Sequence, residues 1–273
     1  MSCNWYALNW KTCFYNLLNP DMLFRCLLAE MQKSRRSMAV WLASLGTLAN
    51  VLIFAALAIF DESKPIANWA DYFAVHYEGI AFMMLPLFVI ILCSLVTYPE
   101  HRTDTWVLLR TLPVGVGPIY FSKYLFMLGL FFLAHLAFVA GMLGSGWLLG
   151  WLHSDFSGLH QMPDWSLLGQ LIGQTLLSVL GLLSLHYWLS LMFRPFIISL
   201  TIGILGFVAT LLLQDQWPLL WLLPYAPPVE YVRLLDPAQT LPLRHGLYLG
   251  LWASLAYSVL FLLGGYVWFV NKR

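Results

Sequence analysis

The sequence predicts an all-α integral membrane protein with six membrane-spanning helices, and three observations lead to this fold class. Hydrophobic residues make up 60% of the 273-residue chain and charged residues only 10%, so the chain is far more apolar than a soluble domain. Its mean hydropathy is +0.75. The apolar residues gather in runs that are each close to the roughly 20 residues that a helix needs to cross a bilayer. A net charge of +1 without a basic cluster does not indicate nucleic-acid binding.

Residues 1–37 are expected to form a cytoplasmic segment with an amphipathic interface helix. They lack the short apolar core and small-residue cleavage site of a signal peptide. The sequence Asn19-Pro20-Asp21 is typical of a helix start. After it, apolar residues recur at helical spacing, so the helix should lie along the inner membrane surface. A plain juxtamembrane anchor that obeys the positive-inside rule explains the same residues. The polar face and the basic end of this helix consist of Arg25, Glu30, Lys33, Arg35 and Arg36.

Residues 38–273 are expected to form the transmembrane domain. Its six spans are predicted at residues 38–60, 79–98, 119–146, 166–192, 196–213 and 246–270. With this assignment, only Lys64, Arg233 and Arg244 of the 14 Lys and Arg residues fall in outer loops. Basic residues accumulate on the cytoplasmic side of membrane proteins, so both termini are predicted to be cytoplasmic.

The outer segment at residues 214–245 differs from the other outer loops. It contains several prolines, yet residues 217–225 are strongly apolar. Prolines prevent a further crossing and the apolar run is too short to span. We therefore expect one or two short re-entrant helices in the outer leaflet, packed between spans 5 and 6. A proline-rich surface loop with interfacial tryptophans is the alternative.

The chain lacks the residue patterns of an enzyme. No Asp or Glu lies inside a predicted span, and the histidines do not show the HExxH spacing of a zinc site. Gly144-Ser145-Gly146 lacks the GxSxG context of a nucleophilic serine, and the cysteines form no CxxC pair. No GxxxxGK[ST] loop is present, so ATP-driven work would need a second polypeptide. We predict no catalytic residue, metal or cofactor in this chain.

Uncharged polar residues are the remaining candidates within the spans. Gln170, Gln174 and Ser178 lie four residues apart in span 4, beside the small residues Gly169 and Gly173. Because unpaired amides are costly in lipid, such a line forms either a helix–helix seam or a wall of a transport pathway. The small residues favour the seam. Asn50 belongs to a second polar stripe, in span 1.

The longest charged interruption between spans is residues 99–123, PEHRTDTWVLLRTLPVGVGPIYFSK, on the predicted cytoplasmic side. Glu100 to Asp104 form a polar start, Trp106, Leu109 and Leu112 an apolar side, and Pro113 an abrupt end. A short helix of this kind fits insertion into a groove on a partner protein. An amphipathic helix that rests on the bilayer is equally compatible with the composition.

The order Glu100 to Asp104, Thr105-Trp106, Leu108-Leu109, Thr111-Leu112-Pro113-Val114 and Ile119-Tyr120-Phe121-Ser122-Lys123 resembles the signature of type-2 ABC exporter permeases, especially the lantibiotic or bacitracin immunity branch. The resemblance implies that residues 99–113 contain a coupling helix that docks on an ABC ATPase. Residues 115–118 depart from the family pattern, which usually has polar or basic residues there. The ATPase-coupling residues would be Glu100, Asp104, Thr105, Trp106, Leu109, Arg110, Leu112 and Pro113.

The resemblance also implies two permease chains, identical or homologous, that pair with two ATPase subunits carrying Mg-ATP. The expected function is therefore that of a permease subunit in the bacterial cytoplasmic (inner) membrane. It would export an amphipathic or hydrophobic substrate, a peptide or lipid-like compound, and could provide antimicrobial peptide immunity. The alternative is a non-transporting membrane scaffold or sensor component that docks a cytoplasmic partner.

Overall fold

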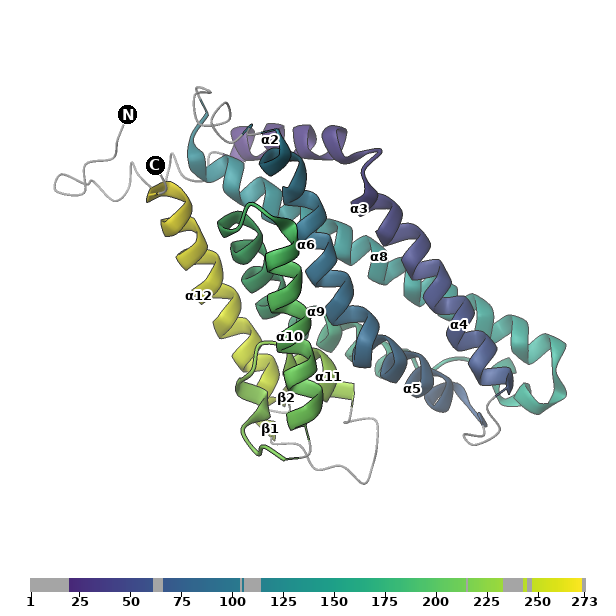
Figure 1. Ribbon diagram of the computed structural model, residues 1–273. Coiled ribbons are helices and arrows are strands. Elements are labelled where there is room, and N and C mark those ends of the chain that lie inside the picture. The colour runs from purple at the N-terminus through teal and green to yellow at the C-terminus, as the bar shows by residue number, and fades with distance from the viewer. Residues whose placement is uncertain are drawn as a thin grey trace.

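A computed structural model describes residues 20–60, 66–103, 105, 114–214, 216–232, 243–244 and 247–271. Within these ranges the chain is almost entirely helical. Long helices run lengthwise beside one another, and one helix lies across an end of the bundle (Figure 1). The strands in the described ranges are β1 (Leu243–Arg244) and β2 (Leu247–Tyr248), which form a short antiparallel pair.

The crossing helix is α2 (Pro20–Ser34), which begins at the predicted helix start and packs against α8. Proline is tolerated at the first helical position, and Asp21 in the first turn and Lys33 in the last complement the helix dipole. Phe24, Leu28 and Met31 remain exposed on this helix. An exposed apolar stripe is compatible with a helix that contacts the bilayer surface.

The first lengthwise segment consists of α3 (Met38–Trp41), the π-helical turn η2 (Leu42–Gly46) and α4 (Thr47–Phe60). The second consists of α5 (Trp69–Gly79), the π-helical turn η3 (Ile80–Met84) and α6 (Leu85–Arg102).

The second segment is longer than the predicted span 79–98. Residues 69–78 lie between the predicted spans 38–60 and 79–98 and were therefore expected to be part of an outer loop, but they form α5. The Asn68 side chain caps this helix by accepting hydrogen bonds from the Ala70 and Asp71 amides. Trp69, Tyr72, Phe73 and Tyr77 are buried on its inner side, and this burial explains why the helix starts so early.

The remaining lengthwise helices are α8 (Val116–Leu152), α9 (Trp165–Met192), α10 (Phe196–Leu213) and α12 (Leu249–Asn271), with the short helix η4 (Ser154–His160) between α8 and α9. At 1.5 Å per residue, the 37 residues of α8 extend about 55 Å, well beyond a hydrocarbon core of about 30 Å. Pro118 lies in the first turn of α8, where proline is tolerated, so this helix begins before residue 119, the predicted start of the third span.

Five helical segments in the described residues are long and apolar enough to cross a membrane. They are Met38–Leu57, Val116–Leu152, Trp165–Met192, Phe196–Leu213 and Leu249–Asn271. The predicted second span is not among them, and α6 ends with the polar residues Glu100, His101 and Arg102. Nevertheless, α5 and α6 run the length of the bundle, and α2 lies at the same end as the C-terminal end of α12 (Figure 1).

The proline-rich segment between α10 and α12 contains two short helices, η5 (Leu220–Leu222) and α11 (Ala226–Glu230). Every residue of α11 is buried, and the helix packs against α9 and α12. The Tyr231 hydroxyl lies 2.5 Å from Thr175 Oγ1, and the Tyr225 hydroxyl lies 3.0 Å from His186 Nε2. These contacts bind the segment to α9. Its depth in the membrane stays a prediction.

Among the described helices, α9 and α12 make the most extensive contact. The Gly181 amide donates to Ser254 Oγ at 2.9 Å, and Ser254 Oγ lies 2.8 Å from the carbonyl oxygen of Leu177. A Cβ atom at Gly181 would lie only 2.9 Å from the Ser254 carbonyl oxygen. The two backbones therefore meet where only glycine fits, as is common in membrane helix pairs.

We predict that Gly181→Ala destabilises the protein by about 1–3 kcal/mol, because the added methyl group overpacks this contact. The measurement is thermal unfolding of the full chain in detergent. Gly173→Ala, on the same helix, is the matched control because nothing lies within 4 Å of its Cβ position. Equal melting temperatures for the two variants would contradict the prediction.

Candidate functional site

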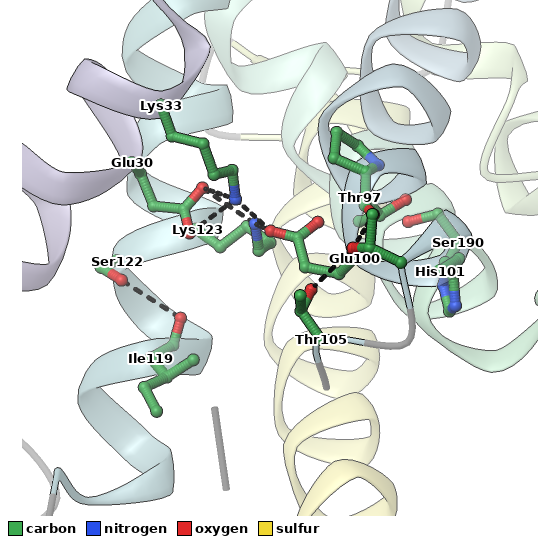
Figure 2. A network of polar contacts seen from close by, with 12 residues as sticks. Glu30, Lys33, Thr97, Glu100, His101, Thr105, Ile119, Ser122, Lys123 and Ser190 are labelled. Atoms are coloured by element: carbon green, nitrogen blue, oxygen red, sulfur yellow. Dashed lines mark hydrogen bonds and ion pairs between the residues drawn. The ribbon is translucent and has the colours of Figure 1, made fainter. Parts of the chain in front are cut away.

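Four charged side chains meet at the end of the bundle where α2, α6 and α8 come together. They are Glu30, Lys33, Glu100 and Lys123, and Figure 2 shows their charged groups turned toward one another. Lys123 Nζ lies 2.7 Å from Glu100 Oε1 and 2.8 Å from Glu30 Oε2. Lys33 Nζ lies 3.0 Å from Glu30 Oε2 and also pairs with Glu100 Oε1. Each ammonium group thus contacts two carboxylates, and the formal charges cancel.

Helix geometry brings these side chains to one place. Glu30 and Lys33 are three residues apart, so they share one face of α2. Glu100 lies in the last turn of α6, and Lys123 lies near the start of α8. The cluster therefore joins α2 to the helices before and after the predicted coupling segment.

Burial makes this pairing energetically important. The side chain of Lys123 is 1% exposed and that of Glu100 is 3% exposed, whereas Lys33 is 40% exposed. A buried charge is costly unless it is paired, and removing one partner leaves the other uncompensated. The Lys123–Glu100 pair is thus the interior of the cluster, and Lys33 is its edge toward solvent.

The ion pairs keep Glu100 and Lys33 charged. Burial alone would raise the pKa of Glu100, but the ammonium groups of Lys123 and Lys33 hold that pKa below its ordinary value. Burial alone would lower the pKa of Lys33, but Glu100 and Glu30 raise it above its ordinary value. The stabilisation from Glu100 is therefore lost only as the pH falls through its lowered pKa. That from Lys33 is lost only above its raised pKa, so both groups are charged at neutral pH.

Neighbouring hydrogen bonds hold the two helix ends in place. His101 Nε2 lies 2.7 Å from the carbonyl oxygen of Ser190, which connects the end of α6 to α9. The Tyr187 hydroxyl donates to the Tyr120 carbonyl oxygen at 2.7 Å, and the Tyr120 hydroxyl donates to that of Leu262 at 2.9 Å. The start of α8 is thereby connected to α9 and α12. The two helix ends that flank the predicted coupling segment are thus both bonded to other helices of the bundle.

The structure revises the predicted position of Glu100. This residue was expected to begin a separate helix directed toward the cytoplasm, but it continues α6 and points into the ion cluster. Its partner, Lys123, lies 23 residues away, and the spacing alone does not show the pair. Thr105 is described beyond the end of α6, with its hydroxyl 3.2 Å from that of Thr103. The other predicted coupling residues lie outside the described ranges: Asp104, Trp106, Leu109, Arg110, Leu112 and Pro113.

The predicted interface residues separate into two groups. Glu30 and Lys33 belong to the cluster, whereas Arg25, Arg35 and Arg36 are exposed. Lys123 was not singled out as a site residue. The signal for it was present, because a lysine just inside an apolar run requires a partner.

The predicted polar residues within the spans do not form one continuous seam in the chain. Ser178 is buried where α9 meets α12, and its carbonyl oxygen accepts a hydrogen bond from Ser254. Gln174 is half-buried and Gln170 is exposed. Asn50 is buried in the first lengthwise segment, beside a cavity. Of these four residues, only Ser178 thus lies in a helix–helix contact of the described chain, that of α9 with α12.

Comparison with known proteins places this site in a family context. Residues 26–210 match the family described as ABC-2 family transporter protein. The match covers more than half of the chain and includes all four residues of the ion cluster. No curated protein matches the sequence.

We predict that Glu100→Gln destabilises the protein by about 3 kcal/mol, because it weakens the pairing of a buried lysine. Adding Lys123→Met should restore part of this loss, because the double variant no longer buries an underpaired ammonium group. Thermal unfolding of the full chain in detergent provides the measurement. Arg36→Gln, at an exposed position outside the cluster, is the control. Strictly additive losses for the two substitutions would contradict the coupling.

Proposed function

The chain belongs to the ABC-2 transporter family, and we propose that it is the membrane-spanning permease subunit of an ABC exporter driven by a separate ATPase. The observation that carries this proposal is the ion cluster. It joins α2 to both ends of the cytoplasmic segment that resembles a coupling region. Because the helix ends on both sides of this segment are bonded to other helices, a docking helix between them can transmit force to the bundle. A docking helix on an unbonded loop would move without displacing the other helices.

The proposed mechanism is alternating access. Binding of Mg-ATP closes the ATPase dimer, which carries the docked segment around Trp106 and Leu112 with it. Because Glu100 and Lys123 join the two ends of this segment, α6 and α8 are displaced together, and α2 follows through Glu30 and Lys33. The partner shifts the conformational equilibrium only by its differential affinity for the two states. Tight docking is therefore needed for coupling.

The proposal includes six crossings, with the segment of α5, η3 and α6 as the second. The arrangement in Figure 1 supports it, because α2 and the end of α12 lie at one end of the bundle. Both termini would then be cytoplasmic, with α2 as the interface helix and with η5 and α11 in the outer leaflet of the bacterial inner membrane. Two such permease chains would pair with two ATPase subunits.

The proposed substrate is amphipathic or hydrophobic, either a peptide or a lipid-like compound. None of the five candidate spans contains Asp or Glu, and residues 79–98 of the proposed second crossing contain none either, so these segments offer no carboxylate for an inorganic cation or for proton coupling. Immunity to membrane-active antimicrobial peptides is a function that fits a substrate of this kind.

We predict that a fluorescent protein that folds only in the cytoplasm will be fluorescent when fused to either terminus of the chain. Six crossings return the chain to its starting side, whereas five would leave the termini on opposite faces of the membrane. Fluorescence of whole cells, normalised to the amount of fusion protein, is the measurement. A fusion inserted after Asp155, near the predicted outer end of α8, is the non-fluorescent control. Fluorescence from one terminus alone would contradict the six-span topology.

We predict that Trp106→Ala weakens association with the ATPase that co-purifies with the full chain by about tenfold or more, as is common for a tryptophan at the centre of an interface. Transport-linked ATP hydrolysis by the assembled complex should fall in parallel. Trp151→Ala is the matched control, because Trp151 is 83% exposed at the opposite end of α8 from the ion cluster. Unchanged association and coupling in Trp106→Ala would remove the docking role, and failure to recover any ATPase would favour the scaffold function.

A further inference from the structure

A cavity of about 210 Å³ lies between the first lengthwise segment, α6 and α8. It is separate from the ion cluster, because none of the four charged residues lines it. An engineered apolar cavity of about 150 Å³ is large enough to bind benzene. The space is therefore sufficient for the apolar part of a small organic molecule.

The cavity lies where two helices depart from regular α-helical geometry. Leu42 and Gly46 bound the π-helical turn η2, Ile80 and Met84 bound η3, and all four residues line the cavity. A π-helical turn inside an α-helix is rare and frequently marks a functional site. Two such turns on facing segments contribute to the same space.

The walls are mainly apolar and aromatic, with Phe88, Phe131 and Phe138 among the lining residues. Among the residues that the structure describes, no charged side chain lines the cavity. Leu42, Met84 and Phe88 are half-buried, whereas Leu45 and Leu48 on the neighbouring face of the first segment are each 55% exposed. In a membrane that face meets lipid, so an apolar ligand can reach the cavity sideways from the bilayer.

Three polar side chains interrupt this apolar lining: Asn50, His135 and Thr47, whose hydroxyl donates to the carbonyl oxygen of Ala43. Asn50 is 7% exposed and His135 is 3% exposed, and both line the cavity. Asn50 Oδ1 and His135 Nε2 have no hydrogen-bond partner among the described residues. Buried polar atoms are usually paired, since an unpaired one costs free energy in an apolar environment. Their presence beside an apolar space points to a ligand with one polar group.

We propose that this cavity binds a neutral amphiphile, with an apolar body against the phenylalanines and a single hydroxyl or amide group bonded to Asn50 and His135. The uncharged lining excludes a charged head group, because the charge would be desolvated without a partner. The binding itself does not depend on ATPase docking. Only the identification of this ligand as a transported substrate rests on the proposed function.

The test uses the full chain in phosphatidylcholine nanodiscs, with 4-butylphenol and its apolar match butylbenzene as probes. Saturation-transfer NMR measures their binding, after correction for partition into empty nanodiscs. We expect 4-butylphenol to bind at least about fivefold more tightly than butylbenzene, as expected for a hydrogen bond to an otherwise unpaired buried group. Asn50→Leu combined with His135→Phe should remove this preference, and Ala134→Leu should weaken both probes by filling the space.

Ser199→Ala is the matched control, because Ser199 is also buried and its hydroxyl has no hydrogen-bond partner in the described part of the chain, but it does not line the cavity. This variant should keep the preference for 4-butylphenol. A diazirine derivative of 4-butylphenol should label peptides from α4, α6 and α8 of the wild-type chain, which tests the site without a substitution. Any of three results would overturn the proposal: partition of the probes equal to that of empty nanodiscs, labelling confined to other helices, or a preference for 4-butylphenol that the double variant retains. The outcome is independent of whether an ATPase co-purifies.

Discussion

The pairing of Lys123 with Glu100 and Glu30 is the interaction on which the cytoplasmic end of the proposed topology depends. A lysine with 1% side-chain exposure is tolerated only because two carboxylates surround its ammonium group. These carboxylates come from two other helices, so α2 and the last turn of α6 must stay in place while Lys123 remains buried. The requirement for charge compensation explains why α2 packs against the bundle and does not only rest on the membrane surface.

The same pairing also connects the two helix ends that flank the predicted coupling segment. Glu100 and Lys123 bring the end of α6 and the start of α8 together, and His101 and Tyr120 connect these helix ends to the rest of the bundle. A force on the intervening segment would therefore reach several helices at once. In this respect the cluster unites the predicted interface helix and the predicted coupling region, which the sequence presents as two separate features.

Local patterns predicted most of the fold, because apolar runs, prolines and caps act over a few residues. The start of α2 and the bounds of α10 follow from such patterns. The start of the second segment at Trp69 did not, because its polar residues resemble a loop until their buried neighbours are known. The ion cluster was also beyond local reasoning, since Glu30 and Lys123 are 93 residues apart. Only the three-dimensional packing of α2 on α8 brings them together.

The polar groups of this protein are divided between two environments, and the division has a physical consequence. The four charges of the ion cluster lie at one end, where Lys33 is still 40% exposed, and a further buried carboxylate, Glu230, lies in α11; the polar groups between the long helices include the uncharged Asn50 and Ser254. Rearranging helices around neutral groups breaks hydrogen bonds without moving a bare charge through lipid, which costs far more. The end that would receive force can therefore remain rigid and ionic, while the interior that would have to change shape between two states can rearrange at a smaller electrostatic cost.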